Sequence, residues 1–385
     1  MARPQARRQR PVNFPEFEME RMQSTWEHRV RYDLSESGVE PLTLAEIAPE
    51  LSALGETRLG YAEGTGREPT RALVAALHPG ATPDNVLMTT GTSEANFLAL
   101  TTLVEPGDDV VVVMPNYMQL HGLARGLGAN VREVWLHEDE GWSLDLGRLR
   151  AAMTGRTKVI CVCTPNNPTG QILSAADLDS VAEVARDHGA WILSDEVYRG
   201  AEHDGVESAS AWGRRERTIV TGGLSKAYGL PGLRVGWLVA PPDQVRSAWA
   251  QKDYTTIASA SLSDVLEEVA LRRRPELLAR TRGILNERWP VLEEWAKTHG
   301  PRLHWTRPRA GAICFFGYAY DTDSVPFVEA LIRDRSTMVV PGAHFLAERH
   351  LRIGFGTPES TLRAGLAEID AAFAALREPA TRASG

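Results

Sequence analysis

One lysine and one arginine stand eight residues apart in LSKAYGLPGLRVGW (residues 224–237), among mostly small or apolar side chains. An unprotonated amine attacks carbonyl carbons, and an apolar environment lowers the pKa of a lysine by disfavouring its ammonium form. We therefore expect Lys226 to be a nucleophile toward a carbonyl compound. A single lysine after a strand is more often a surface residue, so this reading needs support from elsewhere in the chain.

Two further motifs follow apolar runs and carry polar groups that a reactive site could use. SDEVYRG supplies the carboxylate of Asp195 and the phenol of Tyr198, and CTPNNPTG supplies the side-chain amide of Asn167. A carboxylate at such a position can pair with a protonated heteroaromatic nitrogen. Taken alone, helix capping or turn formation explains these residues equally well.

The stretch MTTGTSEANFLAL (residues 88–100) runs from a strand through Gly91 into a helix. The free backbone N–H groups of Thr92 and Ser93, at the positive end of that helix, form an anion site suited to phosphate. Arg234 can add a charge-assisted hydrogen bond to the same anion.

Together these motifs supply an amine nucleophile, a carboxylate, a phenol, an amide and a phosphate cradle. Pyridoxal 5′-phosphate is the cofactor that needs all of them, because it binds as a Schiff base with a carboxylate at its pyridinium nitrogen. The sequence therefore predicts a pyridoxal-phosphate site.

Short Val- and Ile-rich runs alternate with helical segments over the first two thirds of the chain. This order predicts an α/β fold, a three-layer large domain whose mostly parallel sheet is covered by helices on both faces. The chemistry of such a fold lies where strands end and helices begin. The expected strands are residues 85–90, 109–115, 130–136, 157–163, 191–197, 217–223 and 234–241.

The pattern changes near Ser261 to long helices, followed by shorter strand candidates at residues 302–308, 312–319 and 351–356. We expect an N-terminal tail and arm over residues 1–45, a cofactor-binding large domain over 46–284, and a small α+β domain over 285–385. The ends MARPQARRQRPVNF and REPATRASG are typical of a solvated tail and a frayed terminus, although the first also has the acid-free composition of a transit peptide.

The 385 residues carry a formal net charge of −8, which argues against general binding of nucleic acid or an anionic membrane. No apolar stretch reaches the roughly 18 residues of a membrane span. We expect Cys161, Cys163 and Cys314 to be reduced core thiols of a cytoplasmic protein. HFLAERH (residues 344–350) has no zinc-site spacing, and no metal is expected.

TPNNPTG, SDEVY and LSKAYGLPGLRVGW, in this order, resemble motifs of the class I/II aminotransferases among the fold-type I pyridoxal-phosphate enzymes. The resemblance extends over roughly residues 33–375. It implies a transferase that acts on a small-molecule α-amino acid, and a homodimer whose active sites lie between the subunits.

The resemblance also implies roles for individual residues. Lys226 would carry the cofactor as an internal aldimine and move the proton between Cα and C4′ by way of a quinonoid. Asp195 would keep the ring nitrogen protonated, Asn167 and Tyr198 would hydrogen-bond the 3-oxygen, and Tyr117 in MPNYMQL would stack on the ring.

Further roles concern the phosphate, the substrate and the second subunit. Thr92, Ser93, Ser225 and Arg234 would hold the phosphate, and Arg352 in HLRIGFG would bind the substrate α-carboxylate with its planar fork. Tyr61 in RLGYAEG would reach the phosphate of the neighbouring subunit.

DLSESGVEPLTLAEI (residues 33–47) departs from the Gly-Glu-Pro or Gly-Asn-Pro pattern of the family. Gly38 can still offer its backbone to the substrate, and Glu36 either binds a basic substrate group or is solvated. SESG is similar to a segment of the capreomycidine synthase branch, whose enzyme cyclises a hydroxylated arginine.

This departure leaves the reaction open. The first hypothesis is transamination, and the alternative is β- or γ-elimination, replacement or cyclisation in amino-acid-derived specialised metabolism. A non-catalytic binding protein of the same fold is the third. Where Lys226 delivers its proton decides between the first two.

Overall fold

The seven expected apolar runs become the strands of one sheet. The computed structural model describes residues 13–48 and 54–376, so the ends of the expected tail and of the C-terminus lie outside the described residues. The strands are β2 (Val86–Thr90), β3 (Asp109–Met114), β4 (Asn130–Trp135), β5 (Thr157–Cys163), β6 (Trp191–Asp195), β7 (Thr218–Gly223) and β8 (Val235–Val239). Their order is β2-β8-β7-β6-β5-β3-β4. All neighbours are parallel except β8, which is antiparallel to β2 and to β7, so the prediction of a mostly parallel sheet is confirmed.

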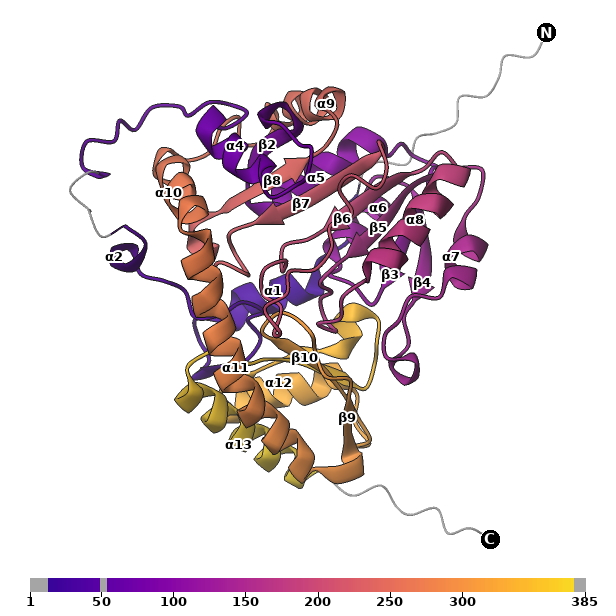
Figure 1. Ribbon diagram of the computed structural model, residues 1–385. Coiled ribbons are helices and arrows are strands. Elements are labelled where there is room, and N and C mark those ends of the chain that lie inside the picture. Colours follow the sequence, from indigo (N-terminus) through magenta and orange to yellow (C-terminus); the bar gives the residue numbers. More distant parts are fainter. Residues whose placement is uncertain (1–12, 49–53, 377–385) are drawn as a thin grey trace.

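Helices cover both faces of this sheet (Figure 1). Along β3, Val110 and Val112 pack into one apolar cluster with α5 (Gly91–Leu103), α6 (Gln119–Gly126) and α9 (Pro242–Lys252). Val111 and Val113 join the cluster on the other face, with α4 (Glu68–Ala75), α7 (Leu146–Ala152) and α8 (Ala175–Asp187). Continuous valine runs are needed because successive side chains of a strand enter opposite cores.

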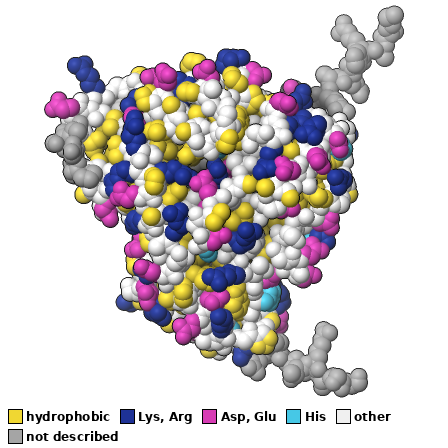
Figure 2. Space-filling model, viewed as in Figure 1, with side chains coloured by type: hydrophobic (Ala, Val, Ile, Leu, Met, Phe, Trp, Pro, Cys, Tyr) yellow, Lys and Arg dark blue, Asp and Glu magenta, His cyan; other side chains and the backbone are white. Residues whose placement is uncertain are grey.

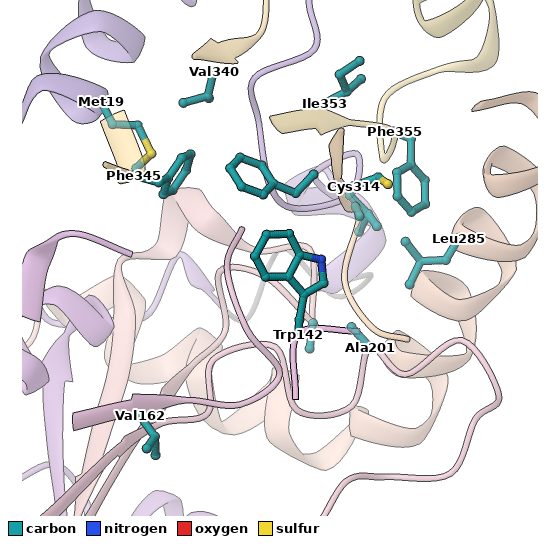
Figure 3. Packing of buried hydrophobic residues seen from close by; sticks show 14 of the residues in the cluster. Met19, Trp142, Val162, Ala201, Leu285, Cys314, Val340, Phe345, Ile353 and Phe355 are labelled. Atoms are coloured by element: carbon teal, nitrogen blue, oxygen red, sulfur yellow. The ribbon is translucent and has the colours of Figure 1, made fainter. Parts of the chain in front are cut away.

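A smaller sheet lies beside the large one, in the C-terminal part of the chain. Its antiparallel strands are β9 (Leu303–Trp305), β10 (Ile313–Tyr318), β12 (Val340–Pro341) and β13 (His350–Gly354), in the order β12-β13-β10-β9. Helices α12 (Ser324–Arg335) and α13 (Glu359–Ala375) cover it. Figure 3 shows Cys314, Phe345 and Phe355 in its core. The predicted α+β region is therefore confirmed.

Long helices connect the two sheets. Helix α10 (Ser261–Arg272) is followed by α11 (Arg274–Thr298), which runs from the level of the large sheet to the small one (Figure 1). The division into domains at residues 45 and 284 stays a prediction. None of the helices in residues 13–48 and 54–376 is long and apolar enough to cross a bilayer.

The N-terminal segment packs against the C-terminal part of the chain. It contains α1 (Glu18–Trp26), β1 (Tyr32–Asp33) and the short helix α2 (Leu44–Ile47). Strand β1 pairs in parallel with β11 (Thr337–Met338), with Tyr32 opposite Thr337. This pairing brings the SESG segment next to the edge of the large sheet where the polar motifs gather.

The three cysteines are free and buried, as expected. Cys161 and Cys163, two residues apart on β5, point to one face of the strand and Val162 between them points to the other, because Cys161 joins one core cluster and Val162 joins the other. Burial raises the pKa of the Cys161 thiol well above its usual value, so it is an inert core group.

A close approach of β8 to the start of α5 fixes the end of the sheet that carries the site. A Cβ atom on Gly236 would lie 2.3 Å from the carbonyl carbon of Gly91 and 2.4 Å from the amide nitrogen of Thr92. Only glycine permits this backbone contact, so Gly236 holds the first turn of α5 against the strand.

We predict that Gly236→Ala lowers the free energy of unfolding by about 1–3 kcal/mol, the usual cost of forcing extra atoms into a packed site. Urea denaturation followed by circular dichroism measures this difference. Gly232→Ala is the control, because nothing lies within 4 Å of a Cβ atom there. Equal stability of the two variants would show that the contact at Gly236 relaxes freely.

Candidate active site

A cavity of about 240 Å³ opens at the carboxyl ends of β5, β6 and β7. The parallel strands bring motifs that are far apart in the sequence to one edge, as the fold class requires. The cavity is lined by most of the predicted residues, namely Glu36, Thr92, Ser93, Tyr117, Asn167, Asp195, Tyr198, Ser225, Lys226, Arg234 and Arg352.

Lys226 lies in the turn after β7 and pairs with a carboxylate. Its Nζ donates a hydrogen bond of 2.7 Å to Oε1 of Glu36, which also accepts the backbone N–H of Gly38 at 2.7 Å. Burial alone lowers the pKa of Lys226, but Glu36 and Tyr198 more than offset this, and the pKa lies above its ordinary value. The expectation of an apolar environment with a lowered pKa was therefore wrong, because nothing in the sequence indicates that Glu36 reaches this lysine.

Asp195 ends β6 as a buried carboxylate with neutral partners. Asn96 of α5 donates to Oδ2 at 2.8 Å, and the backbone N–H of Val197 donates to Oδ1 at 3.1 Å. Burial raises the pKa of Asp195, and these hydrogen bonds only partly oppose it. Among the described residues no cation pairs with this carboxylate, so a protonated ring nitrogen is a suitable partner.

Asn167 connects the phenol of Tyr198 to Arg352. Its Nδ2 donates to the hydroxyl oxygen of Tyr198 at 3.3 Å, and its Oδ1 accepts from Nη1 of Arg352 at 2.9 Å. Burial raises the pKa of Tyr198, so the phenol stays protonated and can donate to an oxygen in the cavity. The expected contact of these two side chains with a ring oxygen of the cofactor stays a prediction.

The first turn of α5 and Arg234 lie together at one end of the cavity, where we expect the anion site. Gly91 begins the helix with φ of +76°, and a Cβ atom there would lie 2.5 Å from Nη2 of Arg234. The hydroxyl of Thr92 donates to the carbonyl of Gly222 at 2.9 Å. The backbone N–H groups of Thr92 and Ser93 lie in the first turn of the helix, where no carbonyl of the same helix is available to them. The 13-residue helix adds its positive end to the charge of Arg234.

Arg352 is a buried arginine of β13, only 1% exposed, without a carboxylate partner among the described residues. Its Nη2 donates to the carbonyl of Ser35 at 2.5 Å, while Nε has no hydrogen-bond partner in the described part of the chain. Its guanidinium lies 5.5 Å from the ring centroid of Phe345 and contacts Met19, and these two residues lie close together in Figure 3. Such a fork fits a substrate carboxylate.

Two predicted residues lie outside this cavity. Gly38 lines a smaller adjoining cavity with Lys226 and Tyr198. Tyr61 is 90% exposed and does not line the site within one chain. Its expected contact with a neighbouring subunit stays a prediction.

Helix α1 supplies a wall that the sequence analysis missed. Glu20, Gln23, Ser24 and Glu27 line the cavity, and Glu20 accepts a hydrogen bond of 2.8 Å from the hydroxyl of Tyr117. Their spacing of three, four and seven residues marks one helical face, so the periodicity was available. Nothing in the sequence shows which part of the protein that face meets.

Asn96 was also missed. It is 1% exposed, donates to Asp195 and accepts a hydrogen bond of 2.7 Å from the hydroxyl of Thr221. Its position as a polar residue inside the otherwise apolar ANFLAL run of α5 was the available signal.

The donor set fits pyridoxal phosphate. An anion end, a buried carboxylate without a cation, a phenol with an amide, and a lysine line one cavity. These groups match the phosphate, ring nitrogen, ring hydroxyl and aldehyde of that cofactor.

We predict that Asn96→Ala weakens the binding of pyridoxal phosphate and destabilises the protein by about 1–3 kcal/mol, because buried oxygens of Asp195 and Thr221 lose their partner. Losing the Asn96 hydrogen bond also raises the pKa of Asp195 further, which weakens its pairing with a protonated nitrogen. Urea denaturation and a visible-light titration with the cofactor measure the two effects.

Thr101→Ala on the same helix is the control, since its hydroxyl bonds only to carbonyls of that helix. Unchanged cofactor affinity in Asn96→Ala would mean that Asp195 is positioned by its other contacts.

Comparisons with known proteins agree with this geometry. Residues 32–369 match the family described as aminotransferase class I and II. The chain is 35% identical to capreomycidine synthase of Streptomyces vinaceus, over 89% of each protein.

Two solved structures share the whole fold. A PLP-dependent aminotransferase from Streptococcus suis superposes with a TM-score of 0.90 at 32% identity, over 95% of this chain and 100% of that one. The PLP-dependent cyclase OrfR gives a TM-score of 0.85 at 29% identity, over 95% of this chain and 98% of that one.

Proposed function

This chain belongs to the aminotransferase class I and II family, and from that premise we propose that it is a transaminase in which Lys226 removes the α-proton of an amino acid held by Arg352. The enzyme uses pyridoxal phosphate. The observation that carries the proposal is that Lys226, Arg352 and Asp195 line one cavity, the second and third without a charged partner among the described residues.

Bound pyridoxal phosphate supplies an aldehyde that condenses with amines and a protonated ring that accepts the electron pair of a broken Cα–H bond. Arg352 would bind the substrate carboxylate and so orient the α-hydrogen toward Lys226. Asp195 would keep the ring nitrogen protonated, Asn167 and Tyr198 would hold the ring oxygen, and Tyr117 would cover the ring.

The remaining proposed contacts fix the two ends of the cavity. The phosphate would be bound by Thr92, Ser93, Ser225 and Arg234. These contacts would position the aldehyde of the cofactor near Nζ of Lys226. The backbone of Gly38, beside Lys226 in the adjoining small cavity, would border the substrate.

A second candidate reaction is elimination, replacement or cyclisation at the substrate side chain. The specific observation in its favour is the 2.7 Å contact between Lys226 and Glu36, within the segment that departs from the family pattern. The similarity to capreomycidine synthase and to the cyclase OrfR supports it as well.

The acidic side of the cavity favours substrates without a second carboxylate. Glu20 of α1, Glu27 directly after that helix, and Glu36 line it, whereas Arg234 lies at the expected anion site and Arg352 is assigned to the α-carboxylate. We propose that Glu36 favours a cationic side chain on the substrate.

We predict that incubating the holoenzyme with L-amino acids, arginine, citrulline and aspartate among them, converts the cofactor to its amine form with the best substrate. Absorbance spectra and mass spectrometry of the products follow the reaction. A keto acid supports transamination, whereas loss or closure of the side chain supports the second candidate. A preference for aspartate over arginine would contradict the proposed role of Glu36.

Two variants test the assignments in the same assay. Lys226→Ala should bind the cofactor without forming a covalent bond that reduction can trap. Arg352→Ala should keep that bond but weaken amino-acid binding by about 2–5 kcal/mol. A trapped adduct in Lys226→Ala would remove this lysine from the proposal.

We propose that a second copy of this chain completes the site. Large apolar side chains are exposed on two adjacent loops: Leu59 and Tyr61 on one, Tyr254, Ile257 and Leu262 on or near the other. The hydroxyl of Ser261 donates to the carbonyl of Gly60 at 2.6 Å and joins these loops into one surface. Figure 2 shows hydrophobic side chains at the upper left, where Figure 1 places α4 and α10.

We predict that the protein is a dimer in light scattering and that Tyr254→Glu with Leu262→Glu produces monomers with weakened cofactor binding. Charges on an apolar interface oppose association because they lose water. Tyr61→Ala should leave the dimer intact and weaken cofactor binding. A wild-type monomer with full activity would refute the shared site.

A further inference from the structure

Glu36 is held against Lys226 by the shape of its own loop. Its Oε1 accepts two hydrogen bonds of 2.7 Å, one from Nζ of Lys226 and one from the backbone N–H of Gly38. A Cβ atom on Gly38 would lie 3.2 Å from this oxygen and 3.6 Å from Cδ of Lys226. The absence of a side chain at Gly38 therefore lets the loop present the carboxylate to the lysine.

The charges around Glu36 keep it ionised. Lys226 lowers its pKa first, burial opposes this, and the Gly38 N–H and Arg352 lower it further, to about 2. Asp33 and Tyr198 are the other titratable groups coupled to this pair. At neutral pH the carboxylate is thus an acceptor, ready to stabilise an ammonium group on Lys226.

We propose that Glu36 is the acid–base partner of Lys226. Its carboxylate stabilises the proton that Nζ of Lys226 takes from the substrate, and so slows the transfer of that proton back to a carbon atom. This inference rests on the part of the proposed function that both candidate reactions share, since it requires Lys226 to be the proton acceptor. It gives Glu36 a part in the reaction itself, in addition to any contact with the substrate side chain.

The position of the substrate's α-proton decides between the two candidate reactions. The Cα–H bond breaks, its proton moves to Nζ of Lys226, and its electron pair is delocalised over the bound cofactor. In transamination the same proton then moves from Nζ to the former aldehyde carbon. When it stays on Nζ, the electron pair instead expels a substituent of the β-carbon and a Cα=Cβ bond forms. A carboxylate that stabilises the ammonium therefore favours the second outcome.

The first test measures the loading of the apoenzyme with pyridoxal phosphate as a function of pH, by visible absorbance. Only the free amine of Lys226 attacks the aldehyde, so the midpoint of the rate profile follows its pKa. Because Glu36 raises that pKa, Glu36→Gln should lower the midpoint by about one pH unit. Below the midpoint this makes loading up to about tenfold faster.

Matched variants separate charge from fold. Glu36→Asp keeps the charge on a shorter side chain and should give an intermediate midpoint. Glu40→Gln, four residues along the same loop and absent from the cavity lining, should match wild type. The cofactor's own protonation changes with pH in the same way for wild type and all three variants, so it does not contribute to differences between their midpoints. An unchanged midpoint in a folded Glu36→Gln would overturn the proposal.

The second test uses β-chloro-L-alanine with the holoenzyme. Chloride leaves without a proton, so the ratio of pyruvate released to cofactor converted to its amine form reports where the Lys226 proton goes. Glu36→Gln should lower this ratio several-fold, and an equal or higher ratio would contradict the proposal. If wild type forms no covalent bond between Lys226 and the cofactor, the proposed function fails instead.

Discussion

Two side chains of the site, Asp195 and Arg352, are buried without an ion-pair partner among the described residues, and the binding of charged ligands there depends on that constraint. Asp195 is held by neutral N–H donors, and Arg352 by carbonyl oxygens and a sulfur atom. An uncompensated buried charge is destabilising, and a ligand of opposite charge relieves it. The apoprotein therefore contains two positions, one suited to a cation and one to an anion, and in the proposed function a protonated ring and a substrate carboxylate would fill them.

The cavity between these charges is built from three parts of the chain that meet only in the folded state. The large sheet supplies the strand ends, β13 of the small sheet supplies Arg352, and the N-terminal segment supplies α1 and Glu36. Asn167 is hydrogen-bonded to Arg352, and Tyr117 to Glu20, so the parts are connected directly through side chains of the site. Relative movement of the small sheet or of α1 would therefore break hydrogen bonds between side chains that line the cavity.

The contact between Lys226 and Glu36 bears on which reaction the site performs, whereas the other residues of the site bear on how it binds the cofactor. Residues that hold a ring and a phosphate serve every reaction of such a cofactor equally. A carboxylate on the reactive amine acts on one proton, and the position of that proton separates transamination from loss of a side-chain group. Fold and family thus establish the cofactor, whereas one loop residue bears on the outcome.

Much of this could be predicted from the sequence because it is local. Apolar runs predicted the seven strands. Polar residues at the end of three of them or within four residues beyond it identified Asn167, Asp195 and Lys226, which parallel strands must bring to one edge. The pairing of Lys226 with Glu36 joins residues 190 apart, and that of Arg352 with Asn167 joins residues 185 apart. The sequence thus determined which groups the protein has for its cofactor, while the tertiary structure decided the protonation of the lysine and the acidic wall of α1, because both depend on distant segments meeting.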